Sequence, residues 1–270
     1  MDANRFCVVR GGGDIATGVI WRLRRCGIPV VVTELDRPLT IRRTVSFSTA
    51  VSMGVMQVEG MEAQRADDLS AVAEILDRGV VPVVISPEIE PLKNVLDIEV
   101  VVDARLAKTP LDTSISDAPF VVGLGPGFEA GIHCHAVIET NRGHRMGRVI
   151  WSGRAQPNTG TPGEIQGRGT ERVIRATIEG TVMWHTAIGE VVTASQIIGT
   201  VENDETTTPI FAPFAGMLRG AIAPATRVTP GLKIADVDPR SDENSWREIS
   251  DKALAIGGGV VEAIFARGPR

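Results

Sequence analysis

The first half of the chain alternates between short apolar runs and segments of helix or loop length. After the first run, Ile15, Val19 and Leu23 recur at helical spacing. A second helix is predicted at Asp68–Asp77. Because strands separated by helix-length segments are typical of parallel sheets, the pattern predicts an α/β domain with a Rossmann-like, doubly wound, mostly parallel sheet. The predicted strands are Arg5–Arg10, Pro29–Thr33, Val55–Val58, Val80–Ile85, Ile98–Val102 and Phe120–Leu124.

The second half contains a repeat. Gly180–Val201 aligns without gaps with Gly216–Val237, at an offset of 36 residues from 180 to 216. Two such β units are expected to pack about a pseudo-two-fold axis, so that each buries the face that the other leaves open. This arrangement resembles the small all-β barrel-sandwich of biotinyl and lipoyl carrier domains. The link between the repeats contains no lysine, so a platform for docking or oligomerisation is predicted instead of a carrier.

Three segments are therefore expected. Residues 1–170 form the Rossmann-like nucleotide-binding domain, 171–240 the two-repeat domain and 241–270 a C-terminal helix. Ser250 can cap that helix, whose three consecutive glycines would weaken it or permit close backbone packing. The helix could pack on the first domain or on the repeat.

Composition excludes several classes of protein. The 270 residues are 43% hydrophobic, enough for a sizeable core, and the formal charge of −5 disfavours a nucleic-acid or anionic-membrane partner. No apolar run approaches the ~18 residues of a membrane span, and no signal-peptide pattern opens the chain, so a cytoplasmic location is predicted. Cys7, Cys26 and Cys134 form no Cys-x-x-Cys pair, which excludes a disulfide framework or a zinc knuckle.

A glycine-rich turn follows the first predicted strand. Gly11, Gly13 and Ala16 fit the G-x-G-x-x-G/A pattern, in which small residues let the backbone approach a pyrophosphate at a helix N-terminus. Glu34 ends the next strand, where an acid commonly binds a ribose hydroxyl. Asp14 could cap the helix but would repel a phosphate, so a nucleoside or a cation-bridged phosphate is also considered. The alternative is a tight turn without a ligand.

The stretch from Val121 to Gly147 has the highest density of glycine and histidine. Its Gly-Pro-Gly turn could hold an anion on backbone N–H groups. His133, His135 and Glu139 lie on one face of an alternating segment and are predicted to form an open metal site with at most three protein ligands. The alternatives are a plain turn for the glycines and hydrogen bonding or core packing for the histidines.

Several polar residues follow predicted strands and should meet at the carboxyl edge of the sheet. Asp103 could instead cap its turn or pair with Arg105, and Arg37, Arg42 and Arg43 could bind an anionic group or simply be solvated. The predicted cofactor-binding residues are Gly11, Gly12, Gly13, Asp14, Glu34, Asp103, Gly125, Gly127 and Asn158.

A family resemblance extends over nearly the whole chain. It rests on VVRGGGDIATG at the start, on GLGPGFEAG, HAVIETNRGH, MGRVI and PNTGTPG in the middle, and on GLKIADVDPR and ISDKALAIGGGVVEA near the end. These runs are similar to the YqeB family of accessory proteins linked to selenium-dependent molybdenum hydroxylases.

The resemblance implies a nucleotide- or cofactor-binding accessory protein in the maturation of such a hydroxylase. Its ligand would be a dinucleotide or another nucleotide, NAD(P) or a molybdenum-cofactor nucleotide, and a metal ion is a further candidate. Its partners would be the hydroxylase or its cofactor-assembly proteins, and a homo-oligomer is expected. The alternative is a small NAD(P)-dependent cytosolic oxidoreductase, and whether the protein is an enzyme stays open.

Overall fold

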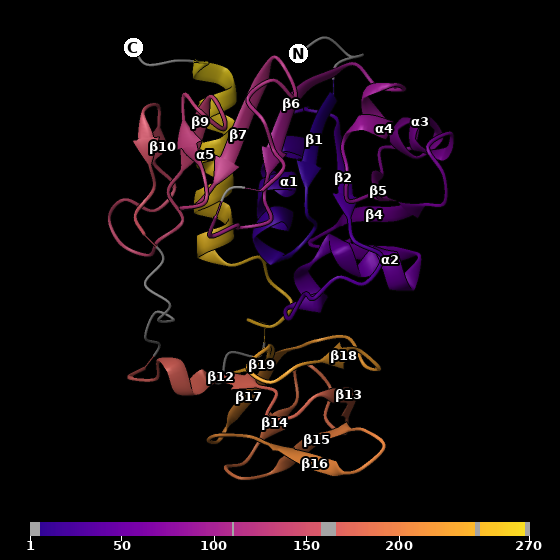
Figure 1. Cartoon of the computed structure of the whole chain (residues 1–270), viewed down its shortest axis with the longest axis vertical. Coiled ribbons are helices and arrows are strands. Elements are labelled where there is room, and N and C mark those ends of the chain that lie inside the picture. Colours follow the sequence, from indigo (N-terminus) through magenta and orange to yellow (C-terminus); the bar gives the residue numbers. More distant parts are fainter. Residues whose placement is uncertain (1–5, 110, 158–165, 241–243, 268–270) are drawn as a thin grey trace. The chain divides into compact units, whose positions relative to one another are not determined.

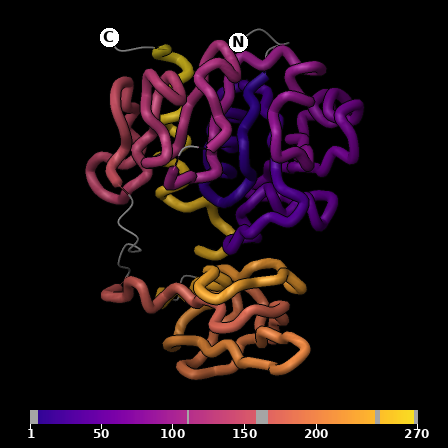
Figure 2. Tube along the Cα trace, in the orientation of Figure 1, coloured from indigo at the N-terminus to yellow at the C-terminus, as the bar shows by residue number. Residues whose placement is uncertain are grey.

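The computed structural model describes residues 6–109, 111–157, 166–240 and 244–267. The chain forms two compact units. The first comprises Met1–Pro38, Ser46–Asn158 and Ile249–Arg270, and the second comprises Leu39–Val45 and Thr159–Glu248 (Figure 1). The end of the chain therefore belongs to the first unit, where the yellow trace lies beside the indigo one (Figure 2).

The first unit is built on a nine-stranded sheet with the order β10-β9-β7-β6-β1-β2-β5-β4-β3. Strands from β9 to β4 in this order pair in parallel, and the two edge strands β10 and β3 are antiparallel to their neighbours. A separate two-stranded sheet joins β8 and β11. The strands are β1 Phe6–Arg10, β2 Val30–Glu34, β3 Val55–Val58, β4 Met61–Ala66, β5 Val81–Ile85, β6 Ile98–Asp103, β7 Phe120–Leu124, β8 Glu129–Ala130, β9 Ala136–Ile138, β10 Val149–Ile150 and β11 Gly153–Arg154.

Two helices of the first unit are long, and they pack against each other. α1 contacts β1 and β2, whereas α5 contacts β7, β9 and β10, so together they cover one face of the sheet (Figure 1). Ser250 caps α5, because its side chain accepts a hydrogen bond from the N–H of Ala253 at 3.2 Å. The helices are α1 Asp14–Arg25, α2 Ala50–Met53, α3 Ala71–Asp77, α4 Glu90–Lys93 and α5 Asp251–Ala266, with 3-10 turns η1 Arg43–Val45, η2 Phe47–Thr49 and η3 Thr170–Arg172.

Glycine makes the contact between α1 and α5 possible. A Cβ atom on Gly18 would lie 2.6 Å from the Cβ of Ala253, and one on Gly257 would lie 2.7 Å from the carbonyl oxygen of Gly18. A Cβ on Gly259 would overlap the carbonyl oxygen of Gly147, so α5 also touches the segment before β10. The glycines of α5 therefore permit close backbone packing.

The prediction of a Rossmann-like, doubly wound fold is wrong, although most strand pairs of the sheet are parallel. The sheet is mixed, since both edge strands are antiparallel, and no described residue between β6 and β7 is helical. Among the described residues only α1 and α5 exceed seven residues. Apolar runs show that strands are buried on both faces, but loops can bury a strand as well as helices can.

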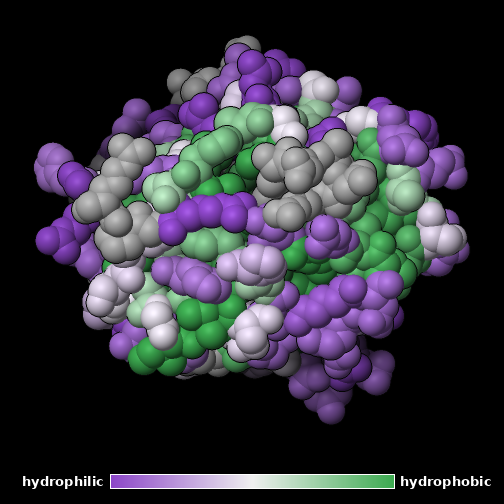
Figure 3. Space-filling model, turned by 90° about the horizontal axis from the view of Figure 1, so that it is seen from above, coloured by the Kyte–Doolittle hydropathy of each residue, from purple (hydrophilic) through white to green (hydrophobic). Residues whose placement is uncertain are grey.

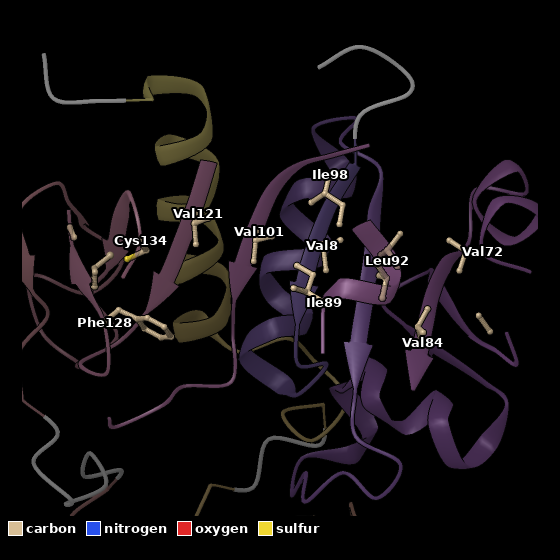
Figure 4. Close-up of a cluster of buried hydrophobic side chains, with 14 of the residues drawn as sticks. Val8, Val72, Val84, Ile89, Leu92, Ile98, Val101, Val121, Phe128 and Cys134 are labelled. Atoms are coloured by element: carbon tan, nitrogen blue, oxygen red, sulfur yellow. The ribbon is translucent and has the colours of Figure 1, made fainter. Parts of the chain in front are cut away.

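Short elements and loops cover the face opposite α1 and α5. In Figure 4, Val101 and Val121 of the sheet lie among side chains contributed from outside it. Leu92 comes from the four-residue α4, and Phe128 and Cys134 come from the segment between β7 and β9. Cys134 is fully buried.

The second unit consists of two four-stranded antiparallel sheets, with the orders β12-β19-β17-β14 and β16-β15-β13-β18. β13, β14 and β15 begin at residues 180, 191 and 197, and β17, β18 and β19 begin 36 residues later at 216, 227 and 233. Each sheet takes strands from both repeats, an arrangement compatible with a barrel-sandwich. The strands are β12 Val173–Arg175, β13 Gly180–Trp184, β14 Val191–Val192, β15 Ile197–Glu202, β16 Thr207–Phe211, β17 Gly216–Ala221, β18 Arg227–Val228 and β19 Lys233–Asp238.

Equivalent apolar positions of the two repeats share one core. Val182 and Leu218 are both fully buried, as are Ile198 and its equivalent Ile234, which is 1% exposed. The segment Leu39–Val45 also belongs to this unit, because the N–H of Ala221 in β17 donates to the carbonyl oxygen of Ile41 at 2.9 Å.

Hydrophobic and hydrophilic side chains are mixed on the surface seen in Figure 3. Green hydrophobic atoms are interspersed with purple hydrophilic ones on the face seen in Figure 3. None of the helices in the described ranges has the length and apolarity needed to span a membrane.

Candidate functional site

The glycine turn after β1 packs against its own chain. The N–H of Gly12 donates to Oε2 of Glu34 at 2.7 Å, so a carboxylate of the protein holds the N–H group that was predicted for a phosphate. On the other side, the N–H of Ser48 donates to the carbonyl oxygen of Gly12 at 2.8 Å. Burial raises the pKa of Glu34, and the N–H groups of Leu35 and Gly12 oppose that rise. Gly13 caps α1 without a side-chain hydrogen bond.

An ionic cluster joins the carboxyl ends of β1 and β6. Asp103 is fully buried, accepts hydrogen bonds from the backbone and side chain of Arg105, and accepts another from the hydroxyl of Thr113 at 2.6 Å. Arg10 donates to the same hydroxyl at 2.7 Å and forms an ion pair with Asp112 at 2.5 Å. Asp103 was considered as a ligand-binding residue or as a residue that caps its turn or pairs with Arg105; the structure shows both the turn cap, through the N–H of Arg105, and the ion pair with its side chain.

The glycines at the end of β7 are explained by packing. A Cβ on Gly127 would overlap the carbonyl oxygen of Ala107, and one on Gly123 would overlap the fully buried ring of Phe128. Gly125 has a φ of +88°, which an L side chain rarely adopts. Ala107 and Phe128, which belong to the same unit, therefore pack against the glycine turn that was predicted to bind an anion.

The two histidines predicted as metal ligands each hold a backbone group. Nδ1 of His133 accepts the N–H of Glu129 at 3.0 Å. Nδ1 of His135 accepts the N–H of Val121 at 3.0 Å, and the ring stacks on Phe120 with centroids 5.4 Å apart. Burial lowers the pKa of His135, which favours the neutral ring that this acceptor role requires.

Both carboxylate oxygens of Glu139 also accept hydrogen bonds from the backbone. It is 2% exposed, and its two carboxylate oxygens accept the N–H groups of Asn141 and Gln156, each at 2.8 Å. Within the described part of the chain, no group of three or more histidine, cysteine, aspartate or glutamate side chains could hold a metal ion. His133, His135 and Glu139 are therefore not brought together, and they do not fit a metal centre.

Two of the three arginines considered for an anionic ligand donate to backbone carbonyl oxygens, and the third is exposed. Arg42 donates to the carbonyl oxygens of Ser245 and Glu248, and Nε of Arg43 donates to that of Ala221 at 2.7 Å. Arg37 is exposed beside Asp36. Asn158 lies outside the described residues.

A cavity of about 580 Å³ lies beside Glu139, and its walls carry four basic side chains. Arg145 is exposed and makes no side-chain hydrogen bond or ion pair within the described residues, and Arg148 donates only to the carbonyl oxygen of His144, at 3.4 Å. Arg154 pairs with Glu129 at 2.7 Å. The lining residues are Glu139, His144, Arg145, Arg148, Val149, Ile150, Arg154, Ala155, Gln156 and Pro157.

This arginine cavity has a basic lining. Among its described lining residues only Glu139 carries a carboxylate, and backbone N–H groups donate to both of its oxygens. Guanidinium groups bind phosphate and carboxylate in a bidentate geometry, and Val149 and Ile150 supply an apolar wall. The cavity can thus hold an anion that carries an apolar or aromatic body. The sequence analysis did not predict this cavity, although Arg145, Arg148 and Arg154 lie within ten residues of one another and could have indicated an anion site.

Comparison with known proteins identifies the family. No protein-family model matches the chain. The chain is 44% identical over 262 residues to the uncharacterized protein YqeB of Escherichia coli (strain K12), a match that covers 97% of this chain and 48% of that protein. The chain belongs to the YqeB family. It spans about half the length of the Escherichia coli YqeB.

Similarity to solved structures is weak. A succinylglutamatedesuccinylase/aspartoacylase from Rhodobacter sphaeroides aligns with a TM-score of 0.24 and 22% identity, over 26% of this chain and 22% of that chain. The apo ectoine utilization protein EutE (DoeB) from Ruegeria pomeroyi aligns with a TM-score of 0.27 and 11% identity, over 86% of each chain. Scores this low carry no argument about the fold or function of this YqeB-family chain.

Proposed function

We propose that this YqeB-family protein is a cytoplasmic accessory protein that binds a nucleotide-type, phosphate-bearing cofactor in its arginine cavity, in the maturation of a selenium-dependent molybdenum hydroxylase. One observation carries the binding part, namely that Arg145 and Arg148 face the cavity without a carboxylate partner among the described residues. The maturation role rests on the sequence motifs shared with the family.

The cavity suits such a ligand in size and in chemistry. Small-molecule sites commonly enclose ~300–1,000 Å³ and combine apolar walls with a few polar anchors. The volume of about 580 Å³ lies inside that range. Two guanidinium groups can neutralise a phosphate dianion, and the apolar wall can contact a flat ring.

The second unit supports the accessory role. It has no lysine on the link between its repeats, so it is proposed as a platform for docking or oligomerisation. The proposed partners are the hydroxylase or its cofactor-assembly proteins, together with further copies of this chain. Because the chain spans about half of the Escherichia coli YqeB, the activity of that whole protein is also a matter of proposal.

The alternative, a small NAD(P)-dependent oxidoreductase, needs a proton donor beside the nicotinamide. Cys134 is fully buried in the core, and burial raises the pKa of its thiol to about 12. His133 and His135 both use Nδ1 to accept backbone N–H groups. The described residues therefore favour cofactor binding over this redox role.

Calorimetric titration tests the binding proposal. ATP, NAD and a molybdopterin dinucleotide would be titrated into the wild-type chain and the double variant Arg145→Gln/Arg148→Gln. Loss of two charge-assisted hydrogen bonds, at ~1.5–3 kcal/mol each, predicts an affinity at least about a hundredfold weaker for the ligand that binds. Arg78→Gln is the control, because Arg78 is exposed in the same unit and donates to Gln64 away from the cavity. Equal affinity in wild type and double variant contradicts the proposal.

The maturation role needs a separate measurement. Cells that produce the hydroxylase without this protein should yield enzyme with a reduced content of molybdenum cofactor, and the wild-type chain should restore it. The cavity double variant should not restore it. Full cofactor content in cells without the protein would refute the accessory role.

A further inference from the structure

Arg10 and Asp103 occupy a distinctive place in the sheet. They are register partners at the carboxyl ends of β1 and β6. The strand order reverses there, since β2 lies on one side of β1 and β6 lies on the other. The side chains that end these two neighbouring strands therefore lie close together, and a third side chain lies beside them.

The third side chain carries a carboxylate. Asp112, on the segment that follows β6, lies 2.5 Å from Nη2 of Arg10 and 2.8 Å from Nη1 of Arg105. The Arg10 side chain is 1% exposed, whereas the Asp112 side chain is 54% exposed. The buried guanidinium of Arg10 thus pairs with a carboxylate that is exposed to solvent, and it also donates to the hydroxyl of Thr113 at 2.7 Å and to the carbonyl oxygen of Pro87 at 2.8 Å.

Asp103 and Asp112 are held in different ways. Asp103 is fully buried and is fixed by the N–H of Arg105 and the hydroxyl of Thr113. Among the described residues, the Asp112 carboxylate contacts only the two guanidinium groups. Asp103 is thus a buried partner of Arg105, whereas Asp112 is an exposed counter-ion of Arg10 and Arg105.

We propose that Arg10 and Arg105 form a binding site for a phosphate group, which Asp112 fills as an internal ligand until an external phosphate displaces it. The site is distinct from the arginine cavity and does not depend on the proposed function. Fork-shaped guanidinium groups suit phosphate at least as well as carboxylate.

The electrostatics of Asp112 are consistent with an anion site. Partial burial by itself raises the pKa of its carboxyl, but hydrogen bonds and charge attraction from Arg10 and Arg105 outweigh this effect and lower the pKa to about 2. The two guanidinium groups therefore favour a full negative charge at this point. Removal of the internal carboxylate leaves Arg10 buried without a counter-ion, which an external anion can supply.

The test uses inorganic phosphate and starts from the Arg145→Gln/Arg148→Gln background, so that the arginine cavity does not contribute. Adding Asp112→Asn removes the internal competitor and should raise the affinity for phosphate by about tenfold, and adding Arg105→Gln should abolish the gain. Asp117→Asn is the matched control. It makes the same change in the same segment between β6 and β7, but the ion pair that it breaks is with Lys93, 3.0 Å away, and not with Arg10 or Arg105. It should leave the affinity unchanged.

Ribose 5-phosphate distinguishes a free phosphate from the phosphate group of a larger ligand, because only an organic ligand should gain affinity from its sugar. An unchanged phosphate affinity in folded Asp112→Asn overturns the proposal. If that variant does not fold, hydrogen exchange of the wild-type chain decides: saturating phosphate should accelerate exchange around Asp112, and unchanged exchange overturns the proposal. Failure of nucleotide binding in the cavity would leave these outcomes intact, so the two proposals can fail separately.

Discussion

The three consecutive glycines of α5 permit a sharp test of how its backbone packs. Gly258 is exposed, and a Cβ added there would meet nothing within 4 Å. Its neighbours are buried: a Cβ on Gly257 would lie 2.7 Å from the carbonyl oxygen of Gly18, and one on Gly259 would overlap that of Gly147. The same substitution, glycine to alanine, therefore has opposite predicted effects at adjacent positions of one helix.

The magnitudes follow from two opposing terms. Alanine is favoured over glycine inside a helix by about 1 kcal/mol, so Gly258→Ala should raise the free energy of unfolding by that amount. Overpacking a close contact costs ~1–3 kcal/mol, and here the opposing atoms are backbone, which cannot turn aside. Gly257→Ala and Gly259→Ala should therefore lower the free energy of unfolding by up to about 2 kcal/mol net, after the helical gain is subtracted.

Thermal unfolding followed by circular dichroism measures these differences. A change of 1 kcal/mol should move the midpoint of a unit of this size by ~2–4 °C, so Gly258→Ala should melt above the wild-type chain and the other two below it. If all three variants were stabilised alike, α5 would not touch α1 or the segment before β10 as described. If all three were destabilised alike, the glycines would serve the helix itself and not its contacts.

Two further predictions concern the central stretch. His135 must be neutral to accept the N–H of Val121, and burial lowers its pKa in the folded state; its contribution to stability should thus be complete above ~6.5 and be lost as pH falls through the folded pKa. Urea midpoints at pH 7.5 and 5.0 check this, and the same pH dependence in His135→Gln would disprove it. Gly123→Ala should cost ~1–3 kcal/mol because the new methyl overlaps the ring of Phe128. In a double-mutant cycle, Phe128→Leu should recover part of that cost, and an unaltered cost would contradict the packing argument.

Most strands of the first unit could be predicted from the sequence. The helices and loops that pack on the two faces of the sheet could not. Val55–Val58 and Phe120–Leu124 were predicted with the bounds that the structure shows. Met61–Ala66 was missed because Glu62 and Arg65 interrupt its apolar pattern. The sheet was expected to be doubly wound because buried strands look alike whether helices or loops cover them. α5 is the last element in the sequence, and no local pattern assigns it a place beside α1.

The site was predicted less well, for a physical reason. Glycine density was taken as a sign of a ligand, but Gly12 and Gly127 are small because Ser48 and Ala107 approach their Cα atoms. Such contacts join residues far apart in the sequence, so a local motif cannot distinguish them from ligand contacts. The basic cavity has no local sequence motif, because its walls combine Glu139 with arginines from the segment that follows it.

The exchange of strands between the two repeats has a consequence for synthesis of the chain. Among the described strands, β12 pairs with β19 alone and β14 pairs with β17 alone, so neither has its partner until a later part of the chain is synthesised. β13, β15 and β16 can already pair with one another. Until Gly216 and the residues after it emerge, the nascent unit has unpaired strands whose edges can join another chain. β14 therefore gains its partner when β17 is made, and β12 gains its partner only when β19 is made.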